Sequence, residues 1–271
     1  MKVLKIFLAL TIIGFSFAAC DKIEAPYTQE VEKPVGNKKV LLEDFTGQKC
    51  VNCPLAHEIA HTLQDTSNYG DKLIVVAIHA GFFATPSAAP FDYDFRTEAG
   101  DIYENFFSVQ TYPTGMVNRV NTDGNYLIDK DGWATEVAKQ FEEPSLVNIE
   151  ITPNLDGNKL SGEVNLEFIE GFASQGNVQI WITEDSIIKP QVIPGGMEED
   201  YVHMHVLRGA INGNWGEALP SASYNSGDTE SVSFSNFQLG DDWVADKLSL
   251  VVYLYEEESK KVIQVEEVKI N

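Results

Sequence analysis

Two cysteines three residues apart carry the strongest chemical signal in this sequence. Cys50 and Cys53 stand in the stretch LLEDFTGQKCVNCP, directly after an apolar run. Such a pair can be a redox couple, half of a metal site or a structural disulfide. A structural disulfide gains stability chiefly by closing a long loop, and this pair closes almost none. We therefore favour the redox couple.

The third cysteine, Cys20, belongs to the N-terminus. Residues 1–19 combine two lysines, an apolar stretch and small residues directly before Cys20, which is the pattern of a secretory signal. A cysteine at that point is typical of bacterial lipoproteins, whereas an uncleaved membrane anchor would need a longer apolar run of roughly 20 residues. We expect 1–19 to be a lipoprotein signal peptide. Lipidation of Cys20 would tie the chain to a lipid bilayer, and the polar residues 20–37 would form a tether.

Composition narrows the class of protein. A hydrophobic content of 44% and an aromatic content of 11% indicate folded domains with real cores. The formal net charge of −22 excludes nucleic acid and anionic membrane surfaces as direct ligands, because both would repel such a chain. An exported chain also enters an oxidising compartment, where a close pair of cysteines is expected to form a disulfide.

The hydrophobic pattern divides the chain near Pro144. Before it, the periodicity predicts an α/β domain over residues 38–144 in which a strand, a helix and a second strand form a βαβ unit. The expected strands are 38–45, 72–80, 112–120 and 124–129, and the expected helices are 49–66, 96–107 and 131–143. After it, about seven short alternating strands predict a β-sandwich over residues 145–271.

This arrangement gives the cysteines distinct roles. They lie between the first strand and its helix, where the positive end of the helix dipole favours a thiolate. Lys49 adds a positive charge beside Cys50. We expect Cys50 to be the exposed, attacking thiolate and Cys53, one turn deeper, to resolve the mixed disulfide.

Two further motifs resemble thioredoxin. Asp44 precedes Cys50 by six residues, the spacing at which thioredoxin has a buried aspartate that handles the proton of the inner cysteine. Tyr112-Pro113-Thr114 resembles the loop in which a cis-proline faces the disulfide in that fold. The sequence departs from the thioredoxin pattern in having Lys49 in place of Trp and Val51-Asn52 in place of Gly-Pro, which leaves the redox potential open.

A metal site is the weaker interpretation of the cysteines. His57 and His61 extend the pattern to C-x2-C-x3-H-x3-H, but on one continuous helix Cys50 and His61 would lie about 16 Å apart. Four ligands at about 2 Å from one ion cannot come from that geometry. His79, His203 and His205 complete no ligand set, so we expect no metal and no cofactor.

Three segments together resemble the outer-membrane-protein-28-related lipoproteins of Bacteroides-type bacteria: EDFTGQKCVNCP, TYPTGMVNR and YVHMHVLRGAINGNWGE. The resemblance implies an outer-membrane lipoprotein with a thioredoxin-like domain followed by an immunoglobulin-like β domain. The function predicted from it is a thiol–disulfide oxidoreductase acting on envelope proteins, with Cys50, Cys53, Asp44 and Pro113 in its site. The alternative is a non-catalytic surface-binding or adhesion lipoprotein in which the disulfide is inert.

Overall fold

A computed structural model describes residues 37–270 of the 271-residue chain. The predicted signal peptide, the lipidation site Cys20 and most of the tether lie outside the described residues. Within residues 37–270, no helix is both long and apolar enough to span a membrane.

Strands outnumber helices in the described chain. The helices are α1 (Cys53–Gln64), α2 (Gly81–Ala84), α3 (Glu98–Phe106) and α4 (Trp133–Phe141), with short 3-10 turns at Gly70–Lys72, Lys130–Gly132 and Ala245–Lys247. The strands are β1 (Val40–Thr46), β2 (Leu73–His79), β3 (Thr114–Val117), β4 (Val147–Asp156), β5 (Lys159–Phe168), β6 (Gly176–Glu184), β7 (Ile187–Ile188), β8 (Gln191–Ile193), β9 (Gly196–Glu198), β10 (Val202–His203), β11 (Val206–Ala210), β12 (Glu217–Ala218), β13 (Thr229–Gln238), β14 (Leu248–Glu256) and β15 (Val262–Lys269).

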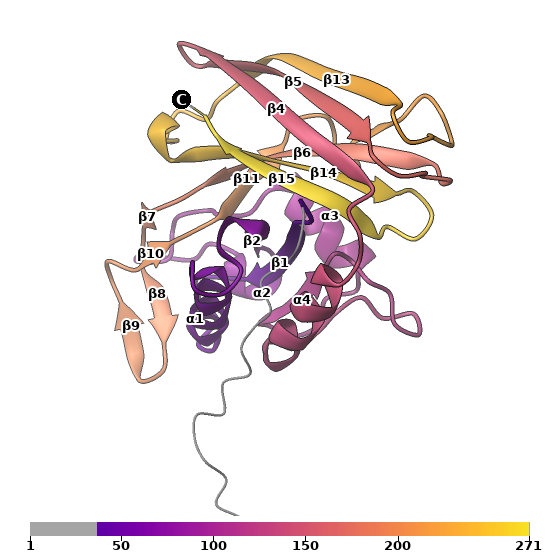
Figure 1. Ribbon diagram of the computed structural model, residues 1–271. Coiled ribbons are helices and arrows are strands. Elements are labelled where there is room, and N and C mark those ends of the chain that lie inside the picture. The colour runs from indigo at the N-terminus through magenta and orange to yellow at the C-terminus, as the bar shows by residue number, and fades with distance from the viewer. Residues whose placement is uncertain (1–36, 271) are drawn as a thin grey trace, which may run out of the picture. The chain divides into compact units, whose positions relative to one another are not determined.

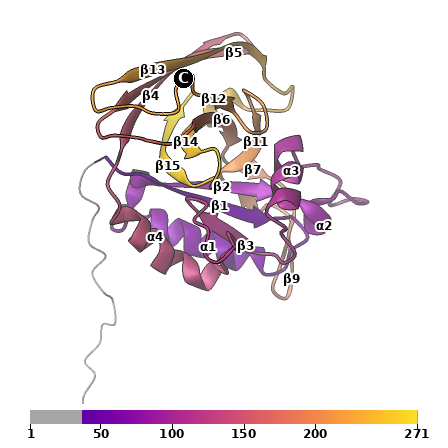
Figure 2. The same cartoon turned by 90° about the vertical axis from the view of Figure 1, so that its right-hand side faces the viewer.

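One eight-stranded sheet runs through the described chain in the order β15-β14-β6-β11-β2-β1-β3, with β12 beside β6. The predicted parallel pairing of the first two strands is confirmed, since β1 and β2 run parallel over their full length. Strand β11 then joins β2 in parallel and β6 antiparallel, so the sheet continues from the first half of the chain into the second. Figures 1 and 2 show this continuity from two sides.

The alternation of side chains along β1 assigns them to opposite faces of the sheet. Val40 and Leu42 pack with residues of α1 and α4 on one face. Leu41 and Phe45 pack with residues of α3 on the other face. Asp44 is in phase with Val40 and Leu42 and therefore belongs to the face covered by α1.

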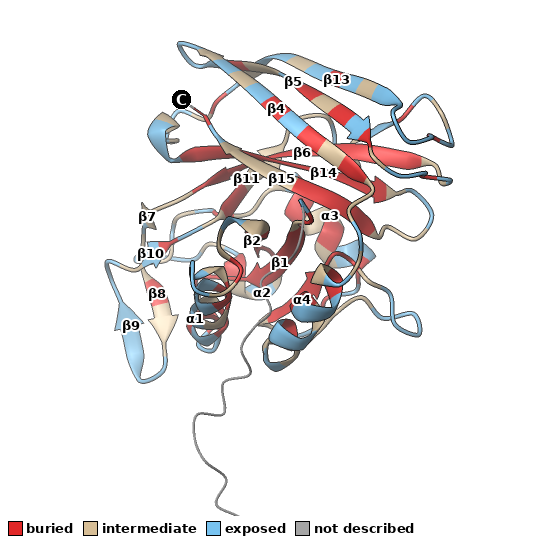
Figure 3. Ribbon diagram, viewed as in Figure 1, coloured by how far each residue is buried: buried red, intermediate tan, exposed pale blue. Residues whose placement is uncertain are grey.

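A second, three-stranded sheet has the order β13-β5-β4. Its inner residues share one hydrophobic core with residues of β6, β14 and β15, so this half of the chain has two β layers. Figure 3 shows that β6 and β14 of the main sheet are buried along most of their length. The expected hairpin around Asp156 and Gly157 is confirmed as β4–β5.

Two expectations about elements are corrected. Residues 124–129 form no strand; they contribute only two isolated bridges, Asn125 with Thr122 and Ile128 with Gly115. Conversely, residues 187–203 contain four short strands, β7 to β10, that the sequence did not predict. The division into domains at residue 144 stays a prediction, although strands from both sides of it share the main sheet.

A buried ion pair lies where the two halves meet. Arg119 Nε and Nη2 each donate a hydrogen bond to a carboxylate oxygen of Glu43 at 2.8 Å, and neither side chain has any exposed surface. The guanidinium lies 5.0–5.9 Å from the ring centres of six aromatic residues. These are Tyr103, Phe107, Trp181, Trp215, Tyr253 and Tyr255. A charge pair and aromatic faces thus connect residues of both halves.

Candidate active site

The two cysteines form a disulfide at the start of helix α1. Cys50 lies in the loop after β1, and Cys53 is the first residue of the helix. The backbone N–H of Lys49 donates to the carbonyl of Phe83 at 3.1 Å. A Cβ at Gly47 would come within 2.5 Å of the Phe83 backbone, so only glycine permits this close packing of the loop on α2.

The disulfide is buried, which corrects the expectation of an exposed Cys50. The exposed fraction is 2% for Cys50 and 0% for Cys53. The sequence pattern correctly places the pair at a helix start, but it gives no information about residues that arrive from elsewhere in the chain. A reductant or client protein therefore has no direct access to either sulfur atom in this conformation.

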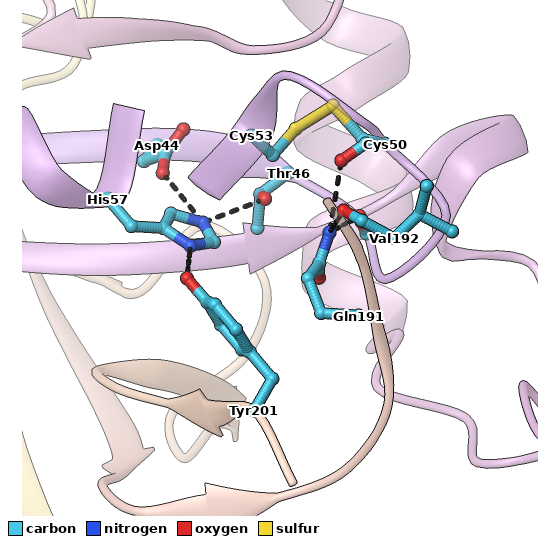
Figure 4. Close-up of a disulfide and its surroundings, with 9 residues drawn as sticks. Asp44, Thr46, Cys50, Cys53, His57, Gln191, Val192 and Tyr201 are labelled. Carbon is cyan, nitrogen blue, oxygen red and sulfur yellow. Dashed lines mark hydrogen bonds and ion pairs between the residues drawn. A yellow bond between two sulfur atoms is a disulfide. The ribbon is translucent and has the colours of Figure 1, made fainter. Parts of the chain in front are cut away.

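Residues 189–193, here called the strap, cover the cysteine loop. The side-chain amide of Gln191 donates to the carbonyl oxygens of Cys50 at 3.0 Å and of Gly47 at 3.4 Å. The backbone N–H of Val192 donates to the carbonyl of Gln48 at 2.9 Å. Figure 4 shows Gln191 and Val192 directly beside Cys50. The strap thus pairs with this loop as an added strand would.

Asp44 lies on the same face of β1 as helix α1 and is 1% exposed. Burial raises the pKa of Asp44 to about 8, because a carboxylate is poorly solvated there. One of its oxygens, Oδ1, has no hydrogen-bond partner among the described residues. At neutral pH Asp44 is therefore mostly a carboxylic acid that can release a proton.

His57 connects Asp44 to Tyr201, a residue of the second half of the chain. Its Nε2 lies 3.4 Å from Asp44 Oδ2 and 3.0 Å from Thr46 Oγ1, and its Nδ1 lies 2.6 Å from the Tyr201 hydroxyl. Burial, with a contribution from the charge of His205, lowers the pKa of His57 to about 4. The imidazole is therefore neutral at pH 7. On α1, His57 follows Cys53 by four residues and shares its helix face, as Figure 4 shows.

Pro113 lies at the end of the sheet from which the cysteine loop leaves. Strand β3 begins one residue later and pairs antiparallel with β1, so that Gly115 is opposite Asp44 and Thr114 is opposite Phe45. The Tyr112–Pro113 peptide bond is cis. The structure therefore brings Pro113, Asp44 and the two cysteines to one end of β1.

All five histidines of the chain line one cavity of about 450 Å³ beside Asp44. His57 and His61 come from α1, His79 ends β2, and His203 and His205 follow Tyr201. Burial and neighbouring histidine charges lower the pKa values of His79 and His203, the latter to about 3, so both imidazoles are neutral. No group of three or more His, Cys, Asp or Glu side chains in residues 37–270 is arranged to hold a metal ion.

Sequence reasoning missed the residues that come from the second half of the chain. Gln191 and Tyr201 contact the cysteine loop and α1, yet the sequence assigns neither a role: Gln191 stands in no motif, and Tyr201 only begins the segment YVHMHVLRGAINGNWGE. The sequence suggests His57 only as a possible third metal ligand beside Cys50 and Cys53, not as a partner of Asp44. The one available signal was its position four residues after Cys53, which places both side chains on one face of a helix.

Comparison with solved structures identifies proteins of the same fold. HBP35 of Porphyromonas gingivalis superposes with a TM-score of 0.68 at 14% sequence identity, covering 86% of this chain and 75% of that one. Protein AGR_C_4864 from Agrobacterium tumefaciens gives a TM-score of 0.51 at 9% identity, covering 86% of this chain and 95% of that one. At these identities the likeness concerns the fold alone.

A domain of the outer membrane lipoprotein Omp28 from Porphyromonas gingivalis is 26% identical over 47% of this chain and 89% of that one, with a TM-score of 0.32. No curated protein matches the chain. The family described as outer membrane protein Omp28 matches residues 100–271, which is more than half of the 271 residues. The protein therefore belongs to the Omp28 family of outer membrane proteins.

Proposed function

We propose that the protein is a lipid-anchored thiol–disulfide oxidoreductase of the outer membrane that acts on envelope proteins. In this proposal the first half of the chain is thioredoxin-like, the second half is an immunoglobulin-like β domain, and acylated Cys20 holds both at the membrane. Client proteins with thiols or disulfides are the substrates. The observation that carries the proposal is the burial of Asp44, 1% exposed, on the face of β1 that α1 covers, with the Cys50–Cys53 disulfide at the start of that helix.

The exchange can be written with atoms and electrons balanced for a client with two thiols. A client thiolate attacks Cys50 Sγ, the Cys50–Cys53 bond breaks, and the electron pair leaves on the Cys53 sulfur. That sulfur takes the proton of the Asp44 carboxylic acid. The second client thiolate attacks the client sulfur and displaces Cys50 as a thiolate. The client leaves with a new disulfide, both cysteines are reduced, and Asp44 regains a proton from solvent.

The roles of the two cysteines follow from their positions in the loop. Cys50 precedes the helix, near the positive end of its dipole and beside Lys49, so its thiolate is the better leaving group. Cys53 is the inner cysteine, on the face of α1 that also carries His57, the contact of Asp44. Exchange runs in either direction, according to the reduction potentials of the protein and its client.

A second candidate is a non-catalytic binding lipoprotein with an inert disulfide. The observation that favours it is the burial of both sulfur-bearing residues under Gln191. Structural disulfides resist reduction, and a covered one is further protected from thiolates. In this alternative the β half makes the functional contacts with a partner.

Trapping of mixed disulfides separates the two candidates. The Cys53→Ser variant should accumulate client proteins linked to Cys50, because attack proceeds and resolution cannot. The Cys50→Ser variant is the matched control and should trap none. The measurement is a non-reducing gel shift of envelope extracts, together with the alkylation rate of reduced Cys50 against pH. A thiol that titrates near 8.5 or above, with nothing trapped, would leave the inert disulfide as the function of the pair.

A further inference from the structure

We propose that the strap, residues 189–193, fills the groove in which a client segment binds, so that an extended client polypeptide must displace it to reach Cys50. This inference rests on the proposed oxidoreductase function and names the partner that the site accepts. It concerns residues of the second half of the chain to which the exchange chemistry itself assigns no role.

The strap has the contacts of a bound peptide. Its Val192 N–H donates to the Gln48 carbonyl, as one strand donates to its neighbour. Gln191 fills the adjoining space with 0% exposure and donates to two carbonyl oxygens of the cysteine loop. These are hydrogen bonds that any extended segment with a free N–H and a donating side chain can reproduce.

On its outer side the strap is held by β9, which pairs with residues 191–193, and by contacts of Lys189 with His203 and Tyr201. Lys189 N–H donates to the Tyr201 carbonyl at 3.1 Å, and the Tyr201 hydroxyl contacts His57. Residues 191–193 of the strap are strand β8, which pairs with β9; the rest of this hairpin, residues 194–200, is exposed, with Met197 39% exposed, and the hairpin projects from the rest of the chain in Figure 1. Little apolar surface is buried by the hairpin itself, so its local opening costs far less than unfolding of the core.

The hydrogen-bond acceptors in the groove indicate which client segment can bind there. They are backbone carbonyl oxygens of Gly47, Gln48 and Cys50, so the groove takes donors. The Gln191 Oε1 atom has no hydrogen-bond partner among the described residues, which means that the strap itself fits imperfectly. We assign the site to an extended, reduced client segment that carries a donating side chain, such as Gln, beside its cysteine.

Exchange kinetics test the displacement. Oxidised full-length protein is mixed with a reduced dithiol peptide that has Gln beside a cysteine, and free thiols are trapped by alkylation over time. Gln191→Ala and Val192→Pro each remove part of the pairing with the cysteine loop and should raise the exchange rate about tenfold or more. Glu198→Ala, an exposed change on the neighbouring strand, is the matched control and should leave the rate unchanged. Equal rates in all four proteins would overturn the proposal.

One further measurement distinguishes the strap proposal from the proposed redox function. Reduction by a small phosphine should also accelerate in the two opened variants, Gln191→Ala and Val192→Pro, because the strap is hydrogen-bonded to the loop that carries Cys50 and holds it closed. If the phosphine reacts faster and no peptide exchanges in any variant, the client proposal and the oxidoreductase function both fail. If wild type and opened variants exchange equally fast, the function stands and the strap proposal fails.

A separate comparison tests whether the client segment needs a donating side chain beside its cysteine. A peptide with Leu in place of Gln has similar size and no donor, and it should exchange more slowly than the Gln peptide with the wild-type protein. In the Cys53→Ser protein linked to the Gln peptide through Cys50, hydrogen exchange at the Val192 amide should rise by tenfold or more. A Val192 amide that stays protected in this adduct, or equal rates for the two peptides, would contradict the proposed groove.

Discussion

Arg119 and Glu43 form a bidentate ion pair that is wholly buried, with both N–H···O distances at 2.8 Å. Glu43 comes from strand β1, next to the Asp44 of the candidate active site, and Arg119 follows strand β3. Trp181, Tyr253 and other rings from the second half of the chain face the guanidinium. The pair therefore links the strand of the cysteine site to the β half.

Replacing one partner of this pair should strongly destabilise the protein. Glu43→Gln leaves the Arg119 charge buried without its counterion, and we expect a loss of about 3–5 kcal/mol in the free energy of unfolding. Urea denaturation at pH 7 measures it. The double variant Glu43→Leu/Arg119→Met should be less destabilised than Glu43→Gln alone, because no charge remains uncompensated.

A surface ion pair supplies the control. Arg96 and Asp94 also form a two-bond contact, but both side chains are partly exposed. Arg96→Met should change stability by less than about 1 kcal/mol. Similar losses for Arg96→Met and Glu43→Gln would mean that burial does not set the strength of the Arg119 pair.

A fragment of residues 38–144 should not fold alone. Its strand β2 would lose its neighbour β11, and Arg119 would lose the rings of Trp181, Trp215, Tyr253 and Tyr255. We expect no cooperative thermal transition by circular dichroism and a poorly dispersed NMR spectrum. A well-dispersed spectrum of the fragment would instead support independent domains on either side of residue 144.

The raised pKa of Asp44 predicts a stability that falls with rising pH. The carboxyl titrates near 3.9 in the unfolded chain, and burial raises the pKa of Asp44 to about 8 in the folded chain. Between these values the folded state holds the extra proton, so the free energy of unfolding declines as pH increases. Asp44→Asn cannot titrate and should be about 2–4 kcal/mol more stable than wild type at pH 7, with no advantage near pH 4.

The matched control for this pH dependence is Asp65→Asn. Hydrogen bonds from Ser67 lower the pKa of Asp65, which is exposed, so this substitution should cost stability at neutral pH and lose that effect in acid. Thermal unfolding from pH 4 to pH 8 compares the three proteins. A constant difference between wild type and Asp44→Asn over this range would contradict a protonated Asp44.

The lipid anchor has a direct test. If Cys20 is acylated, cells fed labelled palmitate should incorporate the label into the protein, and the protein should partition with membranes. One acyl chain binds a bilayer only marginally, so durable attachment implies more than one. Cys20→Ala should abolish both properties, and label that persists in this variant would refute the assignment.

The sequence predicts well those parts of the fold that local pattern determines. The apolar runs of β1 and β2, the helical spacing after Cys53 and the Asp-Gly turn at residue 157 each gave the correct element. The strap escaped prediction because its contact with Cys50 joins residues 141 positions apart. The Arg119–Glu43 pair spans 76 positions. Such contacts leave no periodic trace, since their partners are chosen by the folded chain as a whole.

The long separation between Cys50 and the strap also fixes an order of events. A chain that emerges from its N-terminal end exposes its cysteines well before Gln191 follows, 141 positions later. Oxidation of Cys50 and Cys53 can therefore occur on an open loop, before Gln191 and Val192 are present to form hydrogen bonds with it. Newly made protein thus passes through a stage in which its sulfur atoms meet other molecules freely, and completion of the fold ends that stage.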